Sequence, residues 1–168
     1  MSKFEILTYP DERLKQISTE VTLFDDELQQ FLADLEETMR AGPGGVGIAA
    51  PQVGCFQRIA LVDVSIKPKI EHHGFLVLIN PEIIEYSGFV KGREGCMSVP
   101  DYTGNVMRAE MITLEYQNAL GEKQTIESSG FEARAIQHEL DHLDGLLFLD
   151  RLVSRRNDLF RRKVYQST

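Results

Sequence analysis

Two histidines lie four residues apart in the segment His138-Glu139-Leu140-Asp141-His142. In an α-helix this spacing places the imidazoles about 40° apart around the axis, so both can reach one metal ion. Glu139 lies beside them, where a carboxylate can hold a water molecule and accept its proton. The pattern predicts a catalytic metal site with His138 and His142 as ligands. The alternative is a helix whose histidines are ordinary polar residues.

A catalytic site of this kind needs a third protein ligand and one open position. Peptidases with an extended motif place a third histidine six residues after the second, but this position is Phe148. Peptidases that use a downstream glutamate are also excluded, because no glutamate follows Glu139. Sequence spacing alone leaves three downstream aspartates as possible third ligands: Asp144, Asp150 and Asp158.

Two upstream segments offer further metal-binding side chains. His72 and His73 lie in a charged, turn-rich segment, which favours a solvated loop. Cys96 follows a predicted strand, where Gly95 and Pro100 interrupt strand pairing and can turn its side chain toward a pocket. A thiolate suits borderline metal ions, so Cys96 is the leading candidate and predicts a Cys/His/His site with one position for water. A small buried residue is the alternative role for this cysteine.

A glycine-rich segment, Gly45-Val46-Gly47-Ile48-Ala49-Ala50, matches the dinucleotide-binding fingerprint. That fingerprint follows a strand and opens a helix, whereas this segment follows a predicted helix and runs into Pro51-Gln52. Glycines instead let the backbone approach an extended peptide closely, and Gln52 can offer an amide donor. A tight turn filled by small residues explains the pattern equally well.

Hydrophobic periodicity predicts an N-terminal helix over 24–40, which ends at a Gly-Pro-Gly-Gly run. The middle of the chain reads as strands over 58–64, 75–79, 82–86, 89–93, 107–116 and 123–127. Turns at Ser87-Gly88 and over 118–121 predict antiparallel hairpins.

A second helix is predicted over 129–143, opened by a capping box of Ser129 and Glu132. Its side chains form a histidine stripe, an Ile/Leu stripe and a polar stripe; the polar stripe consists of Arg134, Gln137, Asp141 and Asp144. Two stripes are expected to face inward and the third to face polar surroundings. The predicted fold class is α+β, with antiparallel β-sheets packed around a central helix that carries the histidine motif.

Length and composition favour one compact domain, because the chain has 168 residues of which 42% are apolar. The longest apolar run has five residues, against the roughly 18 that a membrane-spanning helix needs. The N-terminus carries no secretion signal, so we expect a cytoplasmic protein without a membrane partner. A net charge of −8 argues against DNA binding.

Charge is uneven along the chain. Residues 151–168 carry six basic residues and one acidic residue, so this tail has a net charge of +5 and residues 1–150 a net charge of −13. We expect residues 1–150 to form the catalytic domain, with 151–168 as a basic C-terminal tail of the same domain. The tail could meet ribosomal RNA, although a solvated helical end is the simpler interpretation.

Three segments in this order resemble the motifs of peptide deformylases: the glycine-rich segment ending at Gln52, then Glu94-Gly95-Cys96-Met97-Ser98, then the histidine motif. The resemblance covers about residues 5–150. It implies a metallohydrolase that removes the formyl group from the N-terminal methionine of nascent polypeptides and releases formate. It also implies Fe(II) as the native metal, often replaced by Zn(II) or Ni(II).

On this hypothesis Cys96, His138 and His142 hold the metal, and Glu139 carries a proton from water to the leaving amine. The side-chain amide of Gln52 and the backbone N–H of Met97 stabilise the developing oxyanion. The substrate is held by two groups of residues: the backbone of Gly45, Val46 and Gly47, and an apolar pocket that includes Phe131 and Ala135.

Two other functions compete with deformylation. A zinc peptidase that cuts internal peptide bonds shares the helix motif but lacks its third ligand here. A metal-binding module without activity could keep the fold, although the presence of Glu139, Cys96 and Gln52 argues against it.

Overall fold

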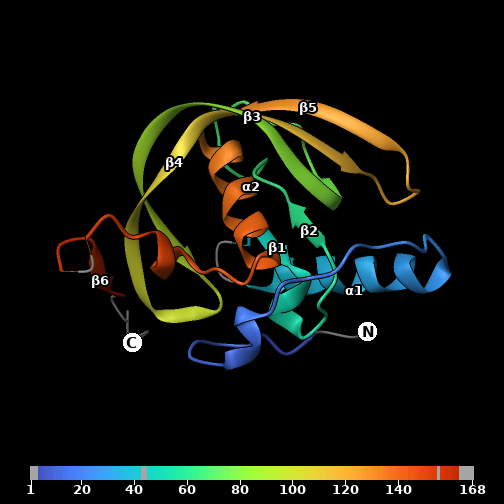
Figure 1. Cartoon of the computed structure of the whole chain (residues 1–168), viewed down its shortest axis with the longest axis horizontal. Helices are drawn as coiled ribbons and strands as arrows, with labels where there is room; N and C mark the ends of the chain where they lie inside the picture. Colours follow the sequence, from blue (N-terminus) through green and yellow to red (C-terminus); the bar gives the residue numbers. More distant parts are fainter. Residues whose placement is uncertain (1–3, 43–44, 155, 163–168) are drawn as a thin grey trace.

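Helix α2 (Gly130–Leu143) lies inside a strongly bent antiparallel sheet, shown in the computed structural model of the chain (Figure 1). The structure describes residues 4–42, 45–154 and 156–162. The strand order is β1-β2-β3-β4-β5, and β6 pairs with β4. The strands are β1 (Gly47–Ala49), β2 (Ile59–Val62), β3 (Leu76–Cys96), β4 (Val99–Gln117), β5 (Lys123–Ser129) and β6 (Leu159–Arg161). The α+β class with a central helix is confirmed, although the predicted sheets form one continuous sheet.

Strand β3 continues through the predicted turn at Ser87-Gly88, so that prediction was wrong. Ser87 pairs with Met111 and Phe89 with Ala109, and Gly88 between them has a φ of +68°. Glycine adopts this left-handed conformation without a Cβ clash, so it bends the strand where a hairpin was expected. The long β3–β4 ribbon therefore curves around α2 (Figure 1). The second predicted turn is confirmed, because β4 and β5 are joined by residues 118–122.

Helix α1 (Asp26–Ala41) agrees with the predicted N-terminal helix. The Asp25 side chain caps it by accepting a hydrogen bond from the backbone N–H of Leu28 at 3.0 Å. Its apolar face packs in a core formed with β1 and β2; the buried members of this face are Leu28, Leu32, Leu35 and Met39. The end of α1 thereby positions the glycine-rich segment that precedes β1.

Helix α2 begins as predicted, but the predicted capping box does not form. The Ser129 side chain makes no capping hydrogen bond. The Glu132 carboxylate instead accepts hydrogen bonds from Ser128 Oγ at 2.8 Å and from the His73 backbone N–H at 2.6 Å. Glu132 is buried, and these two donors satisfy its carboxylate. His73 is consequently tied to α2, and its Nδ1 lies 2.6 Å from Glu132, so the His72-His73 loop is only partly solvated.

The polar stripe of α2 is buried over most of its length, which corrects the expected division into inner and outer faces. Gln137 and Asp141 are both 7% exposed, whereas the side chain of Asp144 is 55% exposed. The Gln137 amide donates to the Ala109 carbonyl and accepts from the Ala109 N–H, at 2.9 and 3.0 Å. Polar residues on a helix require polar partners, and here the sheet supplies them.

The described part of the tail contributes a strand to the sheet and does not form the expected helical end. Arg151 ends the short helix η3 (Phe148–Arg151) and binds Asp141. Strand β6 follows and pairs Arg161 with Tyr102 of β4. Residues 155 and 163–168 of the predicted tail lie outside the described residues. Within the described ranges, no helix is long and apolar enough to cross a membrane.

Candidate metal centre

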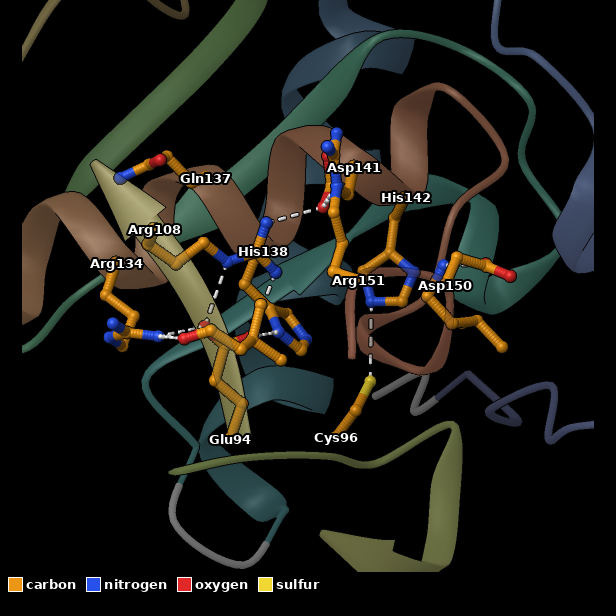
Figure 2. Close-up of polar contacts among 12 residues, drawn as sticks. Glu94, Cys96, Arg108, Arg134, Gln137, His138, Asp141, His142, Asp150 and Arg151 are labelled. Carbon is orange, nitrogen blue, oxygen red and sulfur yellow. Dashed lines mark hydrogen bonds and ion pairs between the residues drawn. The ribbon is translucent and has the colours of Figure 1, made fainter. Parts of the chain in front are cut away.

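Cys96, His138 and His142 meet between the end of β3 and the C-terminal half of α2. The Cys96 Sγ lies 3.4 Å from His142 Nε2. One ligand atom from each of the three side chains lies within 4.8 Å of the other two. Figure 2 shows the Cys96 sulfur pointing toward the His142 ring. Residues far apart in the sequence are thus brought together as one possible ligand set.

The donor set fits a borderline divalent cation. One sulfur and two imidazole nitrogens suit Zn(II) or Fe(II) and disfavour Mg(II) or Ca(II), which prefer oxygen. The Glu139 Oε1 beside these donors is buried and has no hydrogen-bond partner within the described ranges. Buried polar atoms normally have a hydrogen-bond partner, so this oxygen calls for one that the described residues do not supply.

Glu94 of β3 orients His138. The His138 Nδ1 lies 2.8 Å from Glu94 Oε1, and Arg108 binds both oxygens of Glu94 at 2.9 Å (Figure 2). Burial alone would raise the pKa of Glu94, but the hydrogen bonds from His138 and Arg108 hold it far below its ordinary value. The ionised carboxylate therefore fixes the His138 proton on Nδ1 and leaves Nε2 for a metal ion.

Arg108 of β4 also binds Asp141 of α2. Its Nη1 donates to Asp141 Oδ2 at 2.6 Å, and Arg151 adds hydrogen bonds of 3.0 and 2.9 Å to the same carboxylate. Burial lowers the pKa of Arg108, but Glu94 and Asp141 raise it further, so the guanidinium stays charged. This network couples β3, β4 and α2 at the three candidate ligands.

Sequence reasoning missed Glu94, Arg108 and Asp141 as supporting residues. Glu94 and Asp141 lie two residues and one residue from predicted ligands, and that proximity was the available signal. Arg108 carried no such signal, because its partners are distant in the sequence.

The side chain of Gln52, in the short helix η2 (Ala50–Val53), has a defined orientation. Its Oε1 accepts a hydrogen bond from the Ala49 backbone N–H at 2.9 Å. Its Nε2 donates to Ser98 Oγ at 3.0 Å and lies 3.5 Å from Cys96 Sγ. The amide therefore presents its N–H group to the Cys96 sulfur in the cleft.

The glycine-rich segment forms a wall next to Glu139. The Asp63 N–H donates to the Val46 carbonyl at 2.8 Å, so the Val46 carbonyl faces β2. Antiparallel pairing alternates, so the N–H and C=O of Gly47 point to the opposite side. A Cβ on Gly47 would lie 2.5 Å from Glu139 Oε2. Glycine is required here because the carboxylate lies directly against the backbone.

A cleft of about 600 Å³ joins these parts. Ten of the eleven predicted site residues line it; they are Gly45, Val46, Gly47, Gln52, Cys96, Met97, Phe131, Ala135, His138 and Glu139. His142 is 1% exposed and does not line the cleft.

Burial controls the charge of Glu139. It raises the pKa of this carboxylate to about 7, partly opposed by the positive charge of His138. Burial also lowers the pKa of His142 well below its ordinary value. A carboxylate with a pKa near neutral can accept and return a proton, as a general base must.

An α+β fold with a Cys/His/His group and an adjacent glutamate defines a metallohydrolase-type site. The family model described as polypeptide deformylase matches residues 3–158. The peptide deformylases of Thermodesulfovibrio yellowstonii and Wolinella succinogenes are 39% and 43% identical to this chain. The alignments cover 97% and 96% of this chain, and 97% and 92% of the respective relatives.

Solved structures give the same result. The peptide deformylase of Thermotoga maritima superposes with a TM-score of 0.84 at 37% identity, covering 92% of this chain and all of that chain. The peptide deformylase of Legionella pneumophila superposes with a TM-score of 0.83 at 38% identity, covering 90% of this chain and 86% of that chain. The chain belongs to the polypeptide deformylase family. It is a hydrolase that removes the N-formyl group from newly synthesised polypeptides. This activity excludes the two alternative functions, a zinc peptidase and a metal-binding module without activity.

Proposed function

We propose that Cys96, His138 and His142 hold the metal ion of this hydrolase and that Glu139 moves the protons of the reaction. The observation that carries the proposal is the position of Glu139, a buried carboxylate between the Cys/His/His group and the Gly47 backbone. A bound divalent cation supplies a Lewis acid, which lowers the pKa of water toward about 7.

Glu139 accepts a proton from the attacking water and delivers it to the methionine nitrogen as the formyl C–N bond breaks. The products are formate and a free amine. This shuttle needs a carboxylate beside the ligands and not on the metal, and Glu139 Oε1 has no competing hydrogen bond from the described residues.

Gln52 and Met97 supply hydrogen-bond donors for the oxygen that becomes negatively charged. The bond from Ala49 to Gln52 Oε1 fixes which end of the amide faces the Cys96 sulfur. The Met97 backbone N–H is the second proposed donor, in the residue that follows Cys96. One such donor typically contributes about 10² to 10³ in rate.

The substrate backbone pairs with Gly45, Val46 and Gly47, and the methionine side chain packs against Phe131 and Ala135. The outward N–H and C=O of Gly47 support the pairing, since β1 is the edge strand. Phe131 is 37% exposed, so its ring is accessible from the cleft. Main-chain pairing is independent of side chains, which lets one site process many nascent chains.

We further propose Fe(II) as the native metal, with Zn(II) or Ni(II) as substitutes. The sulfur and nitrogen donors support all three ions. Metal analysis of anaerobically purified protein tests this: iron should be the main metal, and air should reduce activity unless Zn(II) or Ni(II) replaces it. Zinc as the main metal of the anaerobically purified protein would contradict the assignment.

Formate release provides the test of the whole function. The protein should release formate from a formyl-Met-Ala-Ser peptide and leave the internal bonds of an unformylated peptide intact. Glu127→Gln, on the exposed face of β5, is the matched control for changes at Glu139. A metal-loaded protein that releases no formate would overturn the proposal.

A cytoplasmic location and ribosome contact through the basic tail complete the proposal. Nascent chains are the substrate, and the tail charge of +5 can attract RNA. Neutralising Arg155, Arg156 and Lys163 should reduce co-sedimentation with ribosomes, whereas neutralising Lys69 and Lys123 should not. Equal co-sedimentation of both variants and the unmodified protein would remove the tail from the proposal.

A further inference from the structure

The cleft carries positive charge although the protein is acidic. Four cationic residues line it, against the two carboxylates Glu94 and Glu139, in a chain with a net charge of −8; the cations are Lys67, Arg93, Arg134 and Arg162. Arg134 is engaged, because its Nη1 binds Glu94 at 2.8 Å. The other three form no ion pair with any described residue. The cleft thus offers positive charge to an anionic ligand.

Strand β6 brings one of these cations from the C-terminal segment. The pairing of β6 with β4 continues beyond the strand, because the Arg162 N–H donates to the Asp101 carbonyl at 2.8 Å. Side chains alternate along an extended chain, so Phe160 and Arg162 share one face and Arg161 lies on the other. The guanidinium of Arg93 stacks 3.8 Å from the centre of the Phe160 ring. Arg93 and Arg162 therefore border the same part of the cleft.

The Arg162 guanidinium lies over the backbone of Gly95. A Cβ on Gly95 would lie 2.7 Å from Arg162 Nη2 and 3.4 Å from the Thr103 methyl group. Gly95 immediately precedes the metal-binding Cys96. A peptide whose formyl end reaches Cys96 and whose backbone pairs with Gly47 passes beside this guanidinium within one or two residues.

We propose that Arg162, with Arg93 beside it, binds a carboxylate in the residue that follows the formyl-methionine or in the next one. The inference rests on the proposed function and adds a preference for substrates with Asp or Glu at these positions. A guanidinium binds a carboxylate through two parallel N–H···O bonds, so it distinguishes Glu from the isosteric Gln. A free C-terminal carboxylate on a very short peptide offers the same chemistry.

The test compares matched formyl-methionyl peptides that end in an amide. They carry Glu or Gln at position 2 or at position 3, counted with the formyl-methionine as position 1. The Glu peptide should have a kcat/KM about fivefold higher at one of these positions, as expected for an exposed ion pair. The difference should lie in KM and shrink in 0.5 M salt. A formyl-Met-Ala-Ser acid compared with its amide measures the terminal carboxylate separately.

Arg162→Gln should remove the preference and Arg162→Glu should reverse it, whereas the matched control Arg161→Gln should retain it. Binding of the same peptides to Glu139→Gln by calorimetry provides a readout without turnover and should show the same order. Equal kcat/KM for Glu and Gln at both positions, or a preference that survives in Arg162→Gln, would overturn the inference while formate release continues. Loss of formate release from every peptide by the unmodified protein would instead overturn the proposed function and the inference with it.

Discussion

His138 and Glu94 form a buried hydrogen bond of 2.8 Å that joins the central helix to the end of β3. The same carboxylate binds Arg108, which in turn binds Asp141 one helical position before His142. The orientation of the first histidine and the placement of the second are therefore set by one ion network. Because Cys96 lies only two residues after Glu94, this network also positions the third proposed ligand.

Replacing Glu94 with Gln should weaken metal binding. The amide cannot hold the His138 ring as a charged acceptor does, and loss of such a partner typically costs 10- to 100-fold in metal affinity. Arg108 would also lose one of the two carboxylates that compensate its buried charge, which should lower the free energy of unfolding by about 3 kcal/mol. Competition with a chelator and urea unfolding measure the two effects. The control Glu85→Gln, on the exposed part of β3, should change neither; an unchanged metal affinity in Glu94→Gln would contradict the proposed role.

Glu139→Gln should separate metal binding from turnover. The amide keeps the shape of the side chain but cannot accept a proton, so kcat should fall by about 10² to 10⁴. Metal content should remain that of the unmodified protein, because the three proposed ligands are untouched. Formate release and metal analysis on the same preparation measure both. Substantial activity in this variant would show that another group transfers the proton.

The histidine spacing and both helices could be predicted from the sequence because they depend on local periodicity. Four-residue spacing defines a helical face, and a glycine run ends a helix wherever it occurs. The path of β3 could not be predicted, because Gly88 is equally suited to a turn and to a bend. The pairing of the residues on either side of Gly88 with β4, which is distant in the sequence, decides between them.

The buried environment of the polar stripe of α2 could not be predicted from the sequence either. Asp141 signals a polar partner, but the sequence alone does not say whether that partner is water or Arg108. Glu132 shows the same limit: its position favours a capping box, yet Ser128 and His73 compete for its oxygens in the folded chain. Arg162 reaches the cleft only because β6 pairs with β4, a contact that a basic tail does not reveal.

The raised pKa of Glu139 predicts a pH-dependent stability in the metal-free protein. Burial raises this pKa from 4.5 to about 7, with His138 and Arg108 opposing and Glu94 and Asp141 adding to the shift. Between these values the folded state holds a proton that the unfolded state has lost, so stability falls as the pH rises from 5 to 8. Relative to Glu139→Gln, the unmodified protein should lose about 2 to 3 kcal/mol over this range. Urea unfolding of both chelator-treated proteins at pH 5 and pH 8 measures the difference, and a constant difference would contradict the shift.

Gly47→Ala should impair activity through Glu139. The added Cβ would lie 2.5 Å from Glu139 Oε2, so the carboxylate must move or the edge strand must shift. We expect kcat to fall at least tenfold, since a displacement of about 1 Å can cost up to about 100-fold in rate. The effects of two substitutions that act through one contact are not additive. The double variant Gly47→Ala/Glu139→Ala should therefore be no less active than Glu139→Ala alone. Kinetics of the two single variants and the double variant, with circular dichroism to confirm folding, complete the cycle. A further loss of activity in the double variant would show that Gly47 acts mainly through the substrate backbone and not through the carboxylate.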